Sequence, residues 1–307
     1  MKISDYKKHN SKYRINKIKE RKSKFLTYNS NSEFTIFDKD LEQILNISVS
    51  EFIDIDFIPE KEQVLYSTGK SVTIIDYNKS VIKTIEIENA EIHIQNEYLW
   101  LASIIDEYFV EVTLHNVSDF NKIASVKIKL NYYASSTSLF SAFSDDNIIL
   151  WILGGHSDGS NNVLLRLENN TITSKFVGDD EVFPIVYFKN NEHLYLMGQD
   201  CFISVTKNEK FYSIDFEEDS VLISYDFLNE TKVLFLMENG LFIFNYLEEN
   251  VEEVDIEVFE KIYDEKYDDY VIDFNYFKIV NNTIFLCYDN DKEKGILEID
   301  INIILEN

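Results

Sequence analysis

A pattern of apolar, aromatic and apolar side chains recurs along almost the whole chain, and only its first copy departs from it, with Ser67 in the third position. The aromatic residues are 34, 51, 44, 40 and 50 residues apart, which is the length of a four-stranded unit with variable loops. The pattern therefore predicts a repeat fold. Its copies are Leu65-Tyr66-Ser67, Leu99-Trp100-Leu101, Leu150-Trp151-Ile152, Leu194-Tyr195-Leu196, Leu234-Phe235-Leu236 and Ile284-Phe285-Leu286.

Each triplet lies in a short apolar run that is followed by a turn signal and a second run. Val233–Met237, for example, is followed by Asn239-Gly240 and then by Leu241–Tyr246. Because Asn-Gly tolerates the positive φ of a tight turn, this order predicts a β-hairpin. The runs Lys24–Tyr28 and Glu33–Phe37 predict a seventh hairpin without the central aromatic residue.

One further run precedes each hairpin and another follows it. The following runs alternate between apolar and polar residues, as in Thr84-Ile85-Glu86-Ile87, and alternation is typical of a half-exposed strand. Continuous apolar runs are typical of strands covered on both faces. Four such strands make a propeller blade. We therefore predict an all-β fold, a seven-bladed β-propeller, with six blades as the alternative if the first hairpin is not a full blade.

The pattern resembles β-propellers of the WD-repeat-like class at the level of architecture. The Trp-Asp signature of that class is missing, and its nearest equivalents are Ile75-Asp76 and Phe37-Asp38. The Gly155-His156 pair follows a second strand, where the class would not place it. The resemblance therefore implies the fold and no functional residues.

Two segments lie outside the blade pattern. Residues 1–24 form a basic N-terminal arm with a net charge of +8, and we expect part of it, Tyr13–Ile18, to close the ring against the C-terminal blade. Residues 25–307 are predicted to form a single propeller domain with an acidic insertion at residues 249–270. We expect this insertion to be solvated and extended, with a short helix at Val258–Glu265.

The acidic insertion supplies the candidate partner-binding residues, because it holds ten carboxylates against Lys261 and Lys266. These candidates are Glu249, Glu252, Glu253, Asp255, Glu257, Glu260, Asp264, Glu265, Asp268 and Asp269.

Charge narrows the classes of partner. The net charge of the chain is −26, so the chain outside the basic arm carries −34. Such a body repels phosphates, which argues against nucleic acid as its ligand. The negative charge favours a basic protein partner, or it serves only to keep the protein soluble. Cys201 and Cys287 lie in apolar runs, where buried free thiols are expected. No secretory or membrane-spanning run is present, so we expect a cytoplasmic protein that engages no membrane.

No catalytic, cofactor or metal motif emerges from the sequence. Asp289, Asp291 and Glu293 precede Gly295, but the spacing differs from that of an EF-hand loop. The five histidines lack zinc spacing. His156 shares a loop with Ser157 and Asp158, yet adjacent loop residues seldom converge into a catalytic triad. We expect no catalytic residues, no metal and no cofactor.

These observations favour a non-catalytic scaffold that binds a basic protein, as an inhibitor or immunity protein or as a subunit of a larger assembly. The alternative is an enzyme with a carboxylate-rich site at the mouth of the central channel. A third reading has the basic arm binding nucleic acid or anionic lipid. Trp100 and Trp151 are predicted to pack between blades rather than to bind a ligand.

Overall fold

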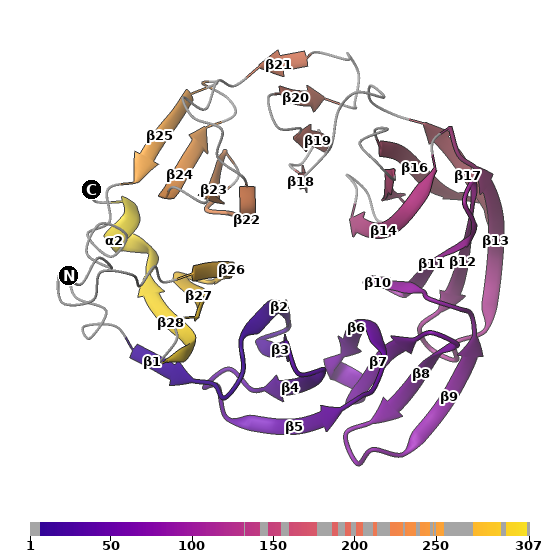
Figure 1. Cartoon of the computed structure of the whole chain (residues 1–307), viewed down its shortest axis with the longest axis horizontal. Helices are drawn as coiled ribbons and strands as arrows, with labels where there is room; N and C mark the ends of the chain where they lie inside the picture. The colour runs from indigo at the N-terminus through magenta and orange to yellow at the C-terminus, as the bar shows by residue number, and fades with distance from the viewer. Residues whose placement is uncertain are drawn as a thin grey trace. The chain divides into compact units, whose positions relative to one another are not determined.

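The computed structural model describes the strands of the chain, the helix at its end and most of their connections (Figure 1). The described residues are 7–131, 133–141, 147–154, 160–176, 186–189, 194–197, 201–204, 211–213, 222–229, 231–237, 240–245, 248, 250–254, 273–289 and 293–305. They are all-β apart from the single 3-10 turn η2 (Pro59–Lys61) and the short helix α2 (Ile301–Leu305).

In the described part of the chain, the strands pair into seven antiparallel four-stranded sheets. The chain divides into two compact units, which are Ser50–Asp215 and Met1–Val49 with Phe216–Asn307. The first unit contains β6 (Phe52–Ile58), β7 (Gln63–Thr68), β8 (Ser71–Asp76) and β9 (Val81–Glu86); β10 (Glu91–Gln95), β11 (Tyr98–Asp106), β12 (Phe109–Asn116) and β13 (Lys122–Lys129); β14 (Ala134–Ser141), β15 (Asn147–Gly154), β16 (Ser160–Glu168) and β17 (Thr171–Phe176); and β18 (Val186–Lys189), β19 (Leu194–Met197), β20 (Cys201–Ser204) and β21 (Phe211–Ser213).

The second unit is built in the same way from the two ends of the chain. It contains β2 (Ile15–Arg21), β3 (Lys24–Asn29), β4 (Glu33–Phe37) and β5 (Gln43–Ser48); β22 (Leu222–Phe227), β23 (Lys232–Met237), β24 (Gly240–Asn245) and β25 (Asn250–Val254); and β26 (Asp273–Val280), β27 (Thr283–Asp289) and β28 (Lys294–Asp300), with β1 (Lys7–Asn10) as their fourth strand.

The triplets lie where the sequence predicts them, on the second strand of their sheets. They fall on β7, β11, β15, β19, β23 and β27. Leu99, Trp100 and Leu101 are all fully buried on β11, so this strand is covered on both faces. The outer strand β13 has mainly exposed and half-buried side chains. The prediction of an apolar second strand and an alternating outer strand is confirmed in this sheet.

The predicted count of seven blades, with six as the alternative, is corrected to five blades. A blade in the predicted sense is made by four successive strands that all contribute apolar side chains to a core. Among the described residues, five sheets meet this description: β2–β5, β6–β9, β10–β13, β14–β17 and β22–β25. The count of seven assumed that every hairpin is completed by the runs directly before and after it, whereas the hairpin of β27 and β28 takes its outer strand, β1, from the start of the chain.

The remaining two sheets differ from this arrangement. For β18–β21 the structure describes strand pairing, and the side chains lie outside the described residues. The sheet of β26, β27 and β28 takes its outer strand, β1, from the other end of the chain. β1 and β28 lie side by side in Figure 1. The expected closing segment Tyr13–Ile18 overlaps β2, which pairs with β3.

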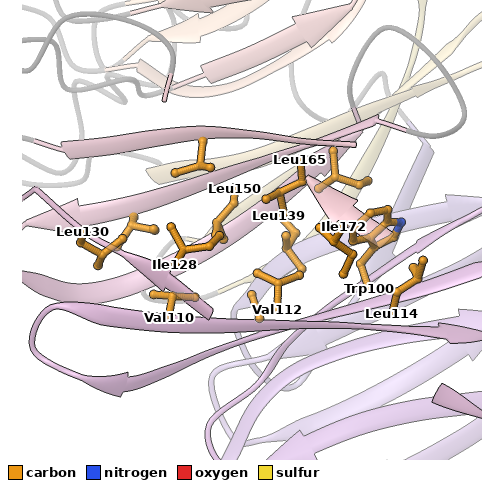
Figure 2. Packing of buried hydrophobic residues seen from close by; sticks show 14 of the residues in the cluster. Trp100, Val110, Val112, Leu114, Ile128, Leu130, Leu139, Leu150, Leu165 and Ile172 are labelled. Carbon is orange, nitrogen blue, oxygen red and sulfur yellow. The ribbon is translucent and has the colours of Figure 1, made fainter. Parts of the chain in front are cut away.

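Apolar clusters join neighbouring sheets within each unit. In the first unit, Trp100 of β11 packs in one cluster with side chains of β14–β17, including Leu139 and Ile172. Figure 2 shows the Trp100 ring beside Ile172 and Leu114. The predicted role of Trp100 in packing between blades is confirmed. For Trp151 the structure describes the backbone of β15, and its side chain lies outside the described residues.

Candidate protein-binding surface

The predicted acidic binding segment is described only where it begins. Glu252 is exposed on β25, and the backbone of Glu253 belongs to the same strand. The other eight candidates, with the expected helix Val258–Glu265, lie outside the described residues. They are Glu249, Asp255, Glu257, Glu260, Asp264, Glu265, Asp268 and Asp269.

The described histidine and cysteine side chains belong to the packed structure. His115 is buried, with Nδ1 3.2 Å from the Phe120 carbonyl oxygen and Nε2 3.2 Å from Thr113 Oγ1. Burial lowers the pKa of His115. Burial also raises the pKa of the Cys287 thiol, which keeps it protonated and unreactive. His156, with its neighbours Ser157 and Asp158, lies outside the described residues.

The Asp289–Gly295 region forms ion pairs in the structure. Lys294 Nζ lies 3.0 Å from Asp289, and Lys8 Nζ lies 3.0 Å from Glu293. Asp291 lies outside the described residues. Within the described part of the chain, no three His, Cys, Asp or Glu side chains are grouped so that they could hold a metal ion.

Carboxylates that are buried or half-buried on the first strands of two sheets were missed by sequence reasoning. Asp54 and Asp56 are buried on β6. Asp54 accepts a hydrogen bond from the backbone N–H of Ile92 at 2.8 Å, and Asp56 accepts one from that of Ile94 at 3.3 Å. Both acceptors connect β6 to β10, the first strand of the next sheet. These carboxylates satisfy backbone donors and link two blades.

The same arrangement recurs in the other unit. Asp226 on β22 accepts a 2.7 Å hydrogen bond from the backbone N–H of Ile279 on β26, and Lys278 Nζ lies 2.7 Å from its Oδ2 atom. Each of these two aspartates precedes a phenylalanine, but Asp119-Phe120 and Asp215-Phe216 share this pattern, so the sequence alone does not single out Asp56 and Asp226. Their partners identify them as packing residues between blades.

The tip of the β11–β12 hairpin presents apolar side chains to solvent. Ile105 is 48% exposed, Tyr108 is 47% exposed and Tyr133, in the connection to β14, is 36% exposed. The pairing of β11 with β12 shifts register between Ile104 and Asp106. Ile105 is therefore the extra residue of a β-bulge, and a bulge redirects a side chain out of the regular alternation.

Hydrogen bonds fix the position of this tip. The Tyr108 N–H donates to Asp106 Oδ1 at 2.9 Å. The Tyr108 carbonyl accepts from the Leu130 N–H, and the Glu107 carbonyl from the Ala134 N–H, both at 2.8 Å. The tip is thereby held against the segment that contains Tyr133. Ile105, Asp106, Glu107, Tyr108 and Tyr133, which we call the hairpin-tip surface, combine apolar and aromatic area with two exposed carboxylates.

Comparison with solved structures decides the fold. The chain is similar to the CNH domain of AfRom2, at 13% identity over 96% of this chain and 97% of that one, with a TM-score of 0.61. It is also similar to the WD40 domain of Neurospora crassa Pan2, at 9% identity over 94% and 91% of the two chains, with a TM-score of 0.63. The fold is that of a β-propeller.

The resemblance to the WD-repeat-like class is thus confirmed at the level of architecture. The computationally designed Ika8 protein is similar as well, at 8% identity over 95% of this chain and 98% of that chain, with a TM-score of 0.56. No family model and no curated protein sequence matches the chain. At these identities the likeness concerns the β-propeller fold alone. Among the described residues, no helix is long and apolar enough to cross a membrane.

Proposed function

We propose that this β-propeller is a non-catalytic protein-interaction module that engages a basic protein partner. The charge distribution carries the proposal. The chain has a net charge of −26, and residues 249–270 hold ten carboxylates against two lysines. Such a surface attracts cationic proteins over roughly a Debye length and repels nucleic acids. The likeness to CNH and WD40 domains is compatible with this function, since propellers present variable loops on a rigid scaffold.

The partner is engaged in the cytoplasm in one of two roles. In the first, the protein is an inhibitor or immunity protein that covers a cationic toxin or nuclease. In the second, it is a subunit of a larger assembly. In both, the ten carboxylates of residues 249–270 supply the docking charge, and the exposed Glu252 on β25 marks where this segment begins.

Affinity capture with the full chain as bait tests the proposal. We expect the captured protein to be basic and to be released at about 0.5 M salt, where the Debye length is roughly 4 Å. Changing the ten carboxylates to their amides should weaken capture, whereas Lys261→Gln with Lys266→Gln, which makes the segment more acidic, should not. Capture of an acidic partner, or capture that salt does not weaken, would contradict the proposal.

A further inference from the structure

We propose that the hairpin-tip surface is a docking site for an arginine- or lysine-bearing segment of the protein partner. This inference rests on the proposed function in that it takes the partner to be a basic protein. It adds a second place of contact, far in sequence from residues 249–270, and it names the chemistry of the contact.

The apolar exposure at the tip contrasts with the rest of the same strand. Leu99, Trp100 and Leu101 of β11 are fully buried, whereas Ile105 is 48% exposed. The bulge leaves about half of this β-branched side chain in water, although burial of its apolar surface would be favourable. Tyr108 and Tyr133 are exposed on segments that backbone hydrogen bonds hold together, and tyrosine is enriched at the centre of protein interfaces.

The tip is held in place before any partner arrives. Asp106 fixes the turn by accepting from the Tyr108 N–H, and two backbone hydrogen bonds tie the tip to residues 130–134. Because the tip is already ordered, binding of a partner costs little conformational entropy of the loop. Preorganisation of this kind raises affinity without additional contacts.

Charge complementarity identifies the partner segment as cationic. The exposed Asp106 and Glu107 carboxylates stand beside the exposed Tyr108. Directly beside the tip, a cation already lies over an aromatic ring, because Lys127 Nζ is 4.3 Å from the centroid of the Phe109 ring. An incoming guanidinium can stack on a tyrosine face in the same manner while it pairs with a carboxylate. A phosphate-bearing ligand would be repelled by the same carboxylates.

Binding of a fluorescein-labelled Arg-rich peptide to the full chain, followed by anisotropy, tests the aromatic part of the site. We expect Tyr108→Ala with Tyr133→Ala to weaken binding about tenfold. The matched control is Phe176→Ala, which removes an aromatic side chain that is 40% exposed at the end of β17. This control should bind like the unaltered chain. All of these residues are exposed, so the variants should unfold at the unaltered temperature.

The charged part of the site has its own pair of variants. Asp106→Asn with Glu107→Gln keeps the side-chain acceptor for the Tyr108 N–H and removes two charges. This variant should bind the peptide more weakly and with a smaller salt dependence than the control Glu97→Gln with Glu168→Gln. Glu97 lies in the turn before β11 and Glu168 ends β16, and both are exposed.

Three results would overturn the inference. One is equal weakening by the tip variants and their controls, which would mean that cations bind anywhere on the acidic surface. Another is absence of peptide binding to the unaltered chain. The third is a dimer in analytical ultracentrifugation that the tyrosine variant abolishes, which would make the tip a contact between copies. If salt-sensitive capture of a basic protein persists in these cases, the proposed function stands while the docking site falls.

Discussion

The sheet β10–β13 and the sheet formed by β26, β27, β28 and β1 are completed in opposite ways. In the first, four successive strands all place apolar side chains in the cores shared with neighbouring sheets. In the second, the outer strand is the four-residue segment Lys7–Asn10, which contains no apolar residue. The first sheet is therefore stabilised mainly by burial, whereas the edge of the second is stabilised by backbone pairing and charge.

The polar edge has a defined set of contacts. Lys7 Nζ lies 2.9 Å from Glu298, and His9 Nε2 contacts the same carboxylate. The Ser11 N–H donates to the Lys294 carbonyl at 2.7 Å. Burial acts to raise the pKa of Glu298, but hydrogen bonds from Lys7 and His9 hold it below its usual value. The sheet β10–β13 should therefore unfold only together with its whole unit. The edge strand β1, by contrast, should detach locally while the rest of its sheet stays folded.

The largest expected effect lies in the apolar sheet. Trp100→Ala should lower the free energy of unfolding by about 3 to 5 kcal/mol, because it leaves a cavity in a fully buried cluster. Trp100→Phe is the control: Trp100 Nε1 makes no hydrogen bond to the described residues, so only volume is lost and the effect should be smaller. Chemical denaturation measures both, and an unchanged stability of Trp100→Ala would refute the packing role.

A smaller loss is expected from the carboxylate that links β22 to β26. Asp226→Ala leaves the Ile279 N–H and the Lys278 ammonium without their acceptor, which should reduce stability by about 3 kcal/mol. Asp226→Asn retains an oxygen acceptor and should recover part of the loss in the same denaturation experiment. Equal effects of the two substitutions would show that the charge matters and the hydrogen bond to β26 does not.

At the polar edge, Gly295→Ala should act locally. A Cβ at this position would collide with the backbone of His9, so β1 would have to move away at a cost of about 2 kcal/mol. Hydrogen exchange should show faster exchange of the amides of residues 7–10, with the protection of β11 and β12 unchanged. Uniform loss of protection throughout the chain would mean that β1 is part of the global folding unit.

The smallest effect concerns Glu298. Its pKa is below the usual value in the folded protein, so its contribution to stability is present at neutral pH and is lost as the pH falls through that lowered pKa. Glu298→Gln should therefore cost about 1 kcal/mol or less at neutral pH, and the difference from the unaltered protein should vanish in acid. Chemical denaturation of both proteins at neutral pH and in acid measures this difference in stability. A difference that grows in acid would contradict the lowered pKa of Glu298.

The sequence predicted the strands that carry an apolar signal and missed the features that depend on pairing. Glu33–Phe37 was predicted with the bounds that β4 has. β1 was missed because Lys-Lys-His-Asn has no apolar alternation, and its place depends on β28 at the far end of the chain. The blade count was wrong because a hairpin signal does not reveal which strands complete the hairpin, and β1 completes the sheet of β26, β27 and β28 from the other end of the chain.

The candidate site was even less predictable. Carboxylates are so abundant that Asp56 and Asp226 could not be distinguished from solvated acids before the structure showed their partners. The exposure of Ile105 results from a bulge, and a bulge is a property of two paired strands rather than of one segment. The only local sign was that the apolar run of β11 continues through Ile104-Ile105 to the polar pair Asp106-Glu107.

The buried Trp100 stabilises the fold, whereas we propose that the exposed tip of the same hairpin binds a basic segment. Measuring melting temperature and Arg-rich peptide affinity side by side for Trp100→Phe and for Tyr108→Ala with Tyr133→Ala tests this contrast most directly. We expect a lower melting temperature with retained affinity for the first variant, and an unchanged melting temperature with about tenfold weaker binding for the second. Full peptide affinity in the tyrosine variant would contradict the proposal.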